Sequence, residues 1–153
     1  MIKIRIAALA ALVCLTGCQT ATVDGMQTTS IGNKVKPIAQ SDLKMGKEQF
    51  YDANYGLAEK HFRKAVEMRA DDAEAWMGLA ASYDQLGRFD FADRAYDQLF
   101  KVAGRKPQIV SNYGYSYLLR GDKKKASKLF KEAAASLPND PRIMANQKLV
   151  ASM

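Results

Sequence analysis

Small and large apolar residues recur along the chain with a period of 34 residues. Four registers keep this period: Gly46, Ala80 and Gly114; Ala58, Ala92 and Ala126; Phe62, Tyr96 and Phe130; and Ala65, Leu99 and Ala133. Two helices can cross closely only where the side chains are small, and the space beside the crossing needs a large side chain. The period and the pattern therefore predict stacked helix-turn-helix units.

Turn and cap residues fall where such units need them. Gly87 and Gly121 each follow an apolar helical run, and glycine adopts without strain the left-handed conformation that ends a helix. Asp71, Asp72 and Asp90 stand just before expected helices. A carboxylate there can accept hydrogen bonds from the free N–H groups of the first turn, so we interpret these aspartates as N-caps and not as a catalytic carboxylate set.

The last stretch of the chain repeats the start of a unit without its second helix. Asp140 is expected as an N-cap, with Pro141 at the first helical position. Terminal units of repeat arrays cover the apolar core with a more polar outer face. Residues 141–153 are therefore predicted to form a capping helix, with its polar face made by Arg142, Asn146, Gln147 and Lys148.

Residues 39–140 resemble three tetratricopeptide repeats in tandem. The middle unit carries the family pattern in Trp76, Leu79, Ala80, Tyr83, Gly87, Ala92 and Tyr96. The third unit carries it in Tyr113, Gly114, Tyr117, Gly121, Ala126, Phe130, Ala133 and Pro138, whereas the first has Ala53 in place of the turn glycine. The resemblance implies an all-α fold over residues 41–153, a tetratricopeptide-repeat helical solenoid of three helix-turn-helix repeats and a C-terminal capping helix.

The N-terminal segment has the pattern of a secretory signal peptide. Lys3 and Arg5 precede an apolar run over residues 6–15 that is too short to span a bilayer. The sequence Leu15-Thr16-Gly17-Cys18 resembles the lipobox of bacterial lipoproteins, which implies cleavage of residues 1–17 and acylation of Cys18. An uncleaved membrane anchor is the alternative.

Residues 18–40 are predicted to be a lipidated flexible tether. They are rich in Thr, Ser, Gly and Gln, include Pro37 and bury little apolar surface. Several acyl chains on one terminus give stable anchoring. Because Gln19 follows the cysteine, the resemblance to Gram-negative lipoproteins implies an outer-membrane location facing the periplasm. Cys14 leaves with the signal peptide, so no disulfide is expected.

The chain is basic, with a formal net charge of +7 that falls to +5 once Lys3 and Arg5 are removed. Much of the excess lies in one predicted helix over residues 122–131, at Lys123, Lys124, Lys125, Lys128 and Lys131. Such a helix could bind anionic lipid headgroups, a wall polymer or an acidic partner. It could equally be the solvated outer face of the array. Nucleic acid is not expected as a partner of an exported protein.

Catalytic chemistry has little support in the sequence. The single histidine, His61, lies beside Phe62 in a predicted second helix, with no second histidine for a metal and no thiol for a nucleophile. No phosphate-binding glycine loop, HExxH or paired CxxC motif occurs. We therefore expect a protein that is not an enzyme and has no metal, cofactor or small-molecule substrate.

Peptide binding is the remaining expectation. In tetratricopeptide arrays the first helix of each unit lines a concave groove, and the resemblance places Leu43, Phe50, Tyr51, Glu74, Gly78, Ala81, Gln108, Ser111, Leu118 and Leu119 on it. The residues selected as the partner groove are Lys44, Lys47, Met77, Asp84, Asn112, Tyr115, Arg142 and Asn146. Asn112 and Asn146 stand 34 residues apart and are expected to stack along the groove, where their amides could bind a peptide backbone. The alternative is that these side chains only face solvent or pack against the cap.

The last third of the chain carries a further resemblance. Ser111-Asn112-Tyr113-Gly114-Tyr115-Ser116, Leu118-Leu119-Arg120-Gly121-Asp122 and Pro141-Arg142 are similar to the TadD-type lipoproteins of Flp (tight-adherence) pilus assembly. This implies an outer-membrane-anchored scaffold that assists assembly of a secretin for pilus export. A pilotin or scaffold of another secretion system and an adaptor for cell-wall hydrolases are the alternatives.

Overall fold

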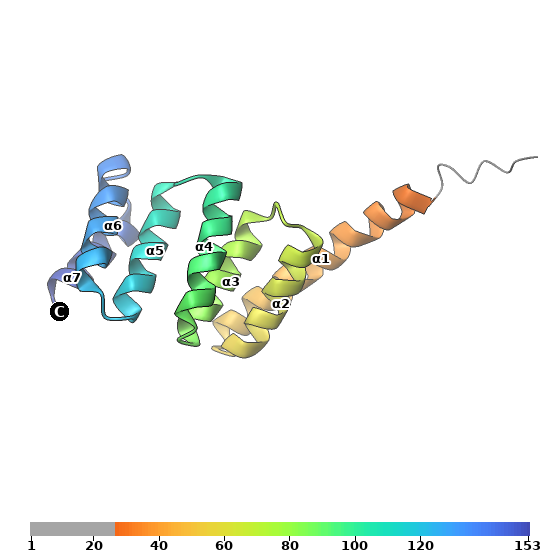
Figure 1. The fold of residues 1–153 in the computed structure, drawn as a ribbon, viewed down its shortest axis with the longest axis horizontal. Coiled ribbons are helices and arrows are strands. Elements are labelled where there is room, and N and C mark those ends of the chain that lie inside the picture. Colours follow the sequence, from red (N-terminus) through yellow and green to blue (C-terminus); the bar gives the residue numbers. More distant parts are fainter. Residues whose placement is uncertain (1–26) are drawn as a thin grey trace, which may run out of the picture.

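The computed structural model describes residues 27–153 of the chain, with side chains from residue 35 onward. This part of the chain contains seven helices and no strand: α1 (Gln27–Tyr51), α2 (Tyr55–Met68), α3 (Ala73–Gln85), α4 (Phe89–Ala103), α5 (Pro107–Leu119), α6 (Lys123–Ser136) and α7 (Pro141–Ala151). Consecutive helices pack in pairs, α1 with α2, α3 with α4 and α5 with α6, and the pairs stack side by side (Figure 1). Helix α7 packs on α5 and α6 at the end of the stack. The predicted all-α solenoid of three repeats and a capping helix is confirmed.

The small-residue register marks the helix crossings, as predicted. A Cβ atom built on Gly114 would lie 2.7 Å from Cε1 of Phe130, and one built on Gly46 would lie 2.8 Å from Cδ1 of Phe62. Both phenylalanines are buried in the core. In the first and third units the backbone of the first helix therefore rests directly on the large ring of its own second helix.

The turns inside the repeats also follow the 34-residue period. Gly87 and Gly121 have positive φ angles of 68° and 81°, which confirms the predicted left-handed turns. Ala53 occupies the same position in the first unit and adopts a φ of 58°. The turn geometry is therefore kept in the first unit although its residue is not glycine, and an L-residue there is strained.

Most of the predicted helix caps are present. The carboxylate of Asp72 accepts hydrogen bonds from the N–H groups of residues 74 and 75, and Asp140 accepts from those of residues 142 and 143 with Pro141 at the first helical turn. The prediction for Asp90 is wrong. Helix α4 begins at Phe89 and not near Phe91, so Asp90 lies inside its first turn and Arg88 stands at the cap position.

The first helix is longer than the sequence indicated. Helix α1 begins at Gln27, so the prediction of a flexible tether is wrong for residues 27–40. The first helix of the repeat array is therefore the C-terminal part of this longer helix. Pro37 lies inside α1, where it removes one backbone hydrogen bond and its ring crowds the carbonyl of the preceding turn. Ala39 and Asp42, in the turns that follow, are buried and stabilise the helix there. The first half of α1 projects past the other helices (Figure 1).

The predictions that fall on the first 26 residues lie outside the described part of the chain. These are the signal peptide, acylation of Cys18 and the beginning of the tether. No helix within residues 27–153 combines the length and the apolar composition needed to cross a bilayer.

Candidate functional site: the concave groove

Helices α1, α3 and α5 line a groove made of two adjoining hollows. The first hollow, of about 220 Å³, is lined by Lys47, Phe50, Tyr51, Phe62, Glu74, Met77, Gly78 and Ala81. The second, of about 260 Å³, is lined by Phe50, Met77, Ala81, Asp84, Gln85, Asn112, Tyr115 and Leu119. Since Phe50, Met77 and Ala81 belong to both, the hollows form one continuous depression across the three first helices.

The surface of the groove is largely apolar. Tyr115 and Leu119 retain 37% and 40% of their accessible surface at one end, and Tyr51 retains 84% at the other. Phe50 lies between them, half-buried, with its ring held edge-on against the ring of Tyr55 at a centroid distance of 5.2 Å. Apolar side chains exposed in a concave surface favour occupation by apolar groups of a partner.

The two lysines predicted for the groove are both engaged by carboxylates. Nζ of Lys47 lies 2.6 Å from Oε1 of Glu74, across the gap between α1 and α3. The hydrogen bond to Glu74 raises the pKa of the Lys47 ammonium, which therefore stays charged. Lys44 lies 3.8 Å from Glu48 on the same helix and lines a further hollow on α1, which shares Lys47 and Tyr51 with the first hollow. The basic side of the groove is thus a set of ion pairs.

Asn112 is placed as predicted, on α5 at the floor of the second hollow. Its side chain is exposed, and its Nδ2 donates to Sδ of Met77 at 3.2 Å. Its second N–H and its amide oxygen have no partner among the residues that the structure describes. The amide can therefore donate to and accept from a peptide backbone laid along the groove.

Asn146 is half-buried and hydrogen-bonded within the protein, unlike the exposed Asn112. Its Nδ2 donates to Oγ of Ser111 at 3.0 Å, so its side chain packs between the cap and the third unit. This contact is equivalent by the 34-residue period to the contact of Asn112 with Met77, but Asn146 lines neither of the two hollows. Arg142 lies at the start of α7, with 82% of its side chain exposed, 3.8 Å from Asp140 and outside both hollows.

Asp84 is not an exposed groove residue as predicted. Its side chain is 4% exposed and accepts hydrogen bonds from Oγ of Ser116 at 2.5 Å and from the hydroxyl of Tyr96 at 3.2 Å. Burial raises the pKa of the Asp84 carboxyl, and these donors oppose the rise. The same burial raises the pKa of the Tyr96 phenol well above its usual value. Asp84 is therefore a structural acceptor at the bottom of the groove.

A polar network centred on Arg120 surrounds Asp84 and was not predicted. The guanidinium donates to both carboxylate oxygens of Asp93 at 3.0 Å and to Ser116, and it lies 4.4 Å from the ring centroid of Tyr117. Although burial lowers the pKa of Arg120, the bond to Asp93 outweighs it and the pKa is raised. This network joins α4 to α5 beneath the groove. The only sign of it in the sequence is that charged residues occur on helix faces that are otherwise apolar.

His61 has a structural contact. Its Nδ1 lies 2.8 Å from Oδ1 of Asp42, and both side chains are mostly buried between α1 and α2. Ser111 and Leu118, which the repeat pattern placed on the groove, are buried. Phe62 of α2, which sequence reasoning assigned to the core alone, also lines the first hollow.

Comparison with known proteins gives the same picture. A family model of the tetratricopeptide repeat matches residues 43–92 and 82–141. A cytochrome c-type biogenesis protein, CycH of Pseudomonas aeruginosa, is 26% identical over 95 residues, which is 61% of this chain and only 23% of the relative.

Two solved structures of similar fold come from bacteria. The Pseudomonas aeruginosa pilF protein is 22% identical, with a TM-score of 0.65 over 77% of this chain and 54% of that one. The Yersinia enterocolitica type III secretion chaperone SycD, in complex with a peptide of the translocator YopD, is 18% identical, with a TM-score of 0.62 over 73% and 91%. At these identities the likeness establishes the fold. The chain belongs to the tetratricopeptide-repeat family, whose members are typically non-enzymatic scaffolds for protein–protein interaction.

Proposed function

We propose that the protein is a bacterial envelope scaffold that holds an extended, apolar segment of a partner protein in its concave groove. The observation that carries this proposal is the continuous depression across α1, α3 and α5, with exposed apolar side chains at both ends and the free amide groups of Asn112 between them. An extended peptide places alternate side chains in the two hollows while its backbone pairs with the amide.

The charges of the groove favour an apolar segment over an acidic one. Lys47 is held by Glu74, and an incoming carboxylate would have to displace that partner. The groove therefore lacks the set of free cations that would bind a terminal carboxylate. Apolar anchors placed on Tyr51, Phe50 and Tyr115 require no such exchange.

We further propose that the scaffold is anchored in the outer membrane through Cys18 and assists assembly of an Flp (Tad) pilus, with a secretin as the partner. The lipobox sequence supports the anchor, and the TadD-like sequence of α5 supports the pilus system. The fold likeness to a type III secretion chaperone that carries a translocator peptide agrees with a groove that serves secretion. A pilotin of another system or an adaptor for wall hydrolases would have the same architecture.

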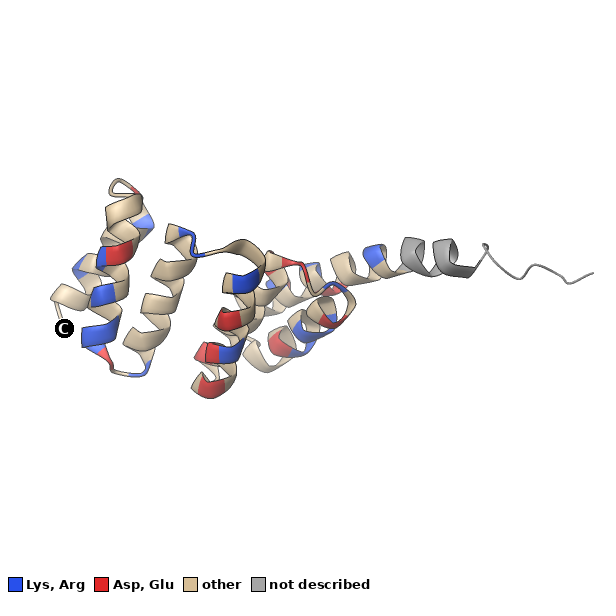
Figure 2. Cartoon of the chain, turned by 45° about the horizontal axis from the view of Figure 1, so that its top comes forward, with Lys and Arg blue, Asp and Glu red and all other residues tan. Residues whose placement is uncertain are grey.

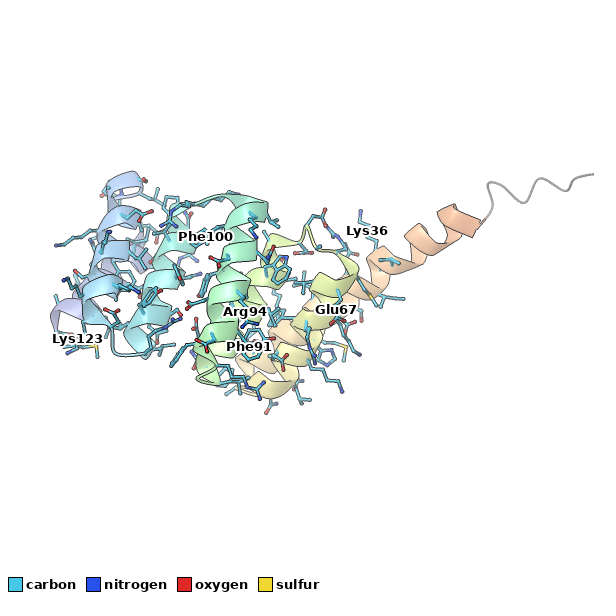
Figure 3. All side chains as sticks on the ribbon, viewed as in Figure 1. Lys36, Glu67, Phe91, Arg94, Phe100 and Lys123 are labelled. Atoms are coloured by element: carbon cyan, nitrogen blue, oxygen red, sulfur yellow. The ribbon has the colours of Figure 1, made fainter. Side chains whose placement is uncertain are left out.

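Capture of partners from crosslinked envelopes of the native host tests this function. The groove variant carries Asn112→Ala, Tyr115→Ala and Leu119→Ala, which are exposed on the concave face. The matched control carries Phe91→Ala and Val102→Ala, apolar residues that are comparably exposed on α4, on the opposite face of the array. Figure 3 shows Phe91 beside Arg94 on α4.

Capture of a secretin or another pilus component by the wild type and the control, but not by the groove variant, is the expected result. Capture of wall hydrolases instead would replace the pilus function with the adaptor function. Equal capture by all three proteins would place the binding surface outside the groove. Normal surface piliation in a deletion strain would rule out the role in pilus assembly.

A further inference from the structure

The outward face of α6 differs in charge from the same face of the other second helices. The 34-residue period places three sets of four exposed residues in equivalent positions: Gly56, Lys60, Arg63 and Glu67 on α2; Asp90, Arg94, Asp97 and Lys101 on α4; and Lys124, Lys128, Lys131 and Ala135 on α6. The first two sets mix both signs, whereas the third has cations only. Figure 2 shows red and blue positions together on α4 and mainly blue positions on α6. The repeat fold therefore does not require the three lysines of α6, here called the lysine stripe.

The lysine stripe has no compensating acid nearby. None of its three ammonium groups forms an ion pair with any described residue, and the first turn of α6 contains no acidic side chain. Glu132 on the same helix is bound to Arg105 at 2.8 Å, and Asp122 caps the helix through the N–H of Lys125. Lysines three and four residues apart on one helix face repel each other, so the stripe weakens the helix that carries it. An anionic ligand would remove that cost.

The lysine stripe borders an amphipathic hollow between α6 and α7. The hollow measures about 360 Å³ and is lined by Lys123, Lys124, Ser127, Phe130, Lys131, Gln147, Val150 and Ala151. Its cations stand on the α6 side, while Val150 and Ala151 form an apolar wall on α7. Lys123 lies at the end of the array away from α1 (Figure 3). Leu149 and Met153, also on this end, are 41% and 60% exposed.

The hollow is not shaped for a further helix of the repeat type. The residue of α7 that follows Gly46, Ala80 and Gly114 in the 34-residue register is Lys148. In the first and third units this position must be small, because the ring of the second helix rests on the backbone there. An exposed lysine at the crossing position prevents that close approach. The occupant must therefore accept ammonium groups and apolar contacts together.

We propose that the α6–α7 end of the array docks on an anionic phospholipid bilayer. The lysine stripe faces headgroup phosphates, and Val150, Leu149 and Met153 meet the apolar part of the interface. A soluble polyanion satisfies the lysines but offers nothing to the apolar side chains, which is why the lipid surface is preferred. The docking is separate from the concave groove and does not depend on acylation of Cys18.

Partition of the full chain between buffer and vesicles tests the docking. Binding to vesicles of phosphatidylcholine alone is compared with binding to vesicles that also contain phosphatidylglycerol. Any insertion of the N-terminal segment that does not depend on lipid charge contributes equally to the two partition coefficients, so it cancels in their ratio. The stripe variant carries Lys124→Gln, Lys128→Gln and Lys131→Gln. The matched control carries Lys60→Gln, Arg63→Gln and Lys64→Gln, which remove the same charge from exposed positions on α2.

The stripe variant should lower the anionic-to-neutral ratio on the order of 100-fold, since a basic residue near an anionic surface contributes about 1 kcal/mol. The control should lower it only a few-fold, because charges farther from the surface are screened. Amide hydrogen exchange in α6 should slow on the mixed vesicles and not on phosphatidylcholine.

An equal fall of the ratio in both variants would mean that net charge alone drives binding and would overturn the proposal. An unchanged ratio in the stripe variant would overturn it as well. Equal protection of α6 on both kinds of vesicle would show that the contact is apolar and that the lysines have no role.

Discussion

Gly114→Ala should destabilise the protein, although alanine is a better helix former than glycine. In an unhindered helix interior this change stabilises by about 1 kcal/mol. Here the new Cβ would lie 2.7 and 2.9 Å from two atoms of the Phe130 ring and 3.2 Å from Cβ of Leu129. Because Phe130 is completely buried, its ring has no free space to move into.

The magnitude follows from these two opposed effects. Forcing a methyl group into a packed crossing costs about 1–3 kcal/mol and the gain in helix propensity returns about 1 kcal/mol, so we expect a net loss of up to about 2 kcal/mol. The change should appear in urea unfolding as a lower midpoint with an unchanged slope. Gly114→Trp should cost several kcal/mol by the same overpacking.

Two variants control this experiment. Gly56→Ala introduces the same methyl group in α2, where no atom lies within 4 Å, and should leave stability unchanged or raise it. Gly114→Ala combined with Phe130→Leu removes the ring that the methyl group meets, so the two changes should cost less than the sum of their separate effects. If Gly114→Ala is as stable as Gly56→Ala, the assignment of Gly114 to the crossing is refuted.

Three further changes test other parts of the structure. Asp84→Asn should flatten the pH dependence of stability. Because the pKa of Asp84 is raised in the folded protein, the native state keeps this proton to a higher pH than the unfolded chain does. The stability of the wild type therefore loses the contribution of Asp84 as the pH rises from about 4 through the folded pKa. Urea midpoints measured across this range should show the fall in the wild type only, and parallel curves would contradict the burial of Asp84. Asp140→Ala removes the two cap bonds of α7 and should cost about 1 kcal/mol in thermal unfolding, whereas an unaltered melting temperature would show that α7 does not unfold with the array. Ala53→Gly relieves a residue at a φ of 58° and should stabilise by about 0.5–1 kcal/mol, and a loss of stability would argue against strain at this turn.

The repeat period predicted the parts of the fold that depend on packing between helices. Gly46 and Gly114 mark helix crossings and Gly87 marks a turn because those positions tolerate few other residues. The residues at which individual helices begin were predicted less well. Helix α4 was expected to begin near Phe91 and begins at Phe89, because aspartate at position 90 suits both a cap and a first turn.

Which of the predicted groove residues are exposed depends on contacts between repeats, and the sequence pattern of a single repeat does not contain those contacts. Asp84 and Asn146 occupy groove positions by register, yet each is drawn into a bond with a serine of the third unit, at 2.5 and 3.0 Å. Both partners are more than 30 residues away in the sequence. The helical state of residues 27–40 was missed for a different reason, because Thr-rich composition and Pro37 disfavour a helix locally while buried contacts further along stabilise it.

Helix α1 also determines how a mechanical load on the N-terminal side reaches the groove. Lys47 and Phe50, which form one wall of the groove, belong to the same helix that leads out of the array. Pro37 stands about 15 Å before Lys47 along that helix, at a rise of 1.5 Å per residue, and the missing backbone bond makes it the weakest point in bending. A sideways pull on the projecting half is therefore expected to bend α1 at Pro37 before it distorts the wall of the groove.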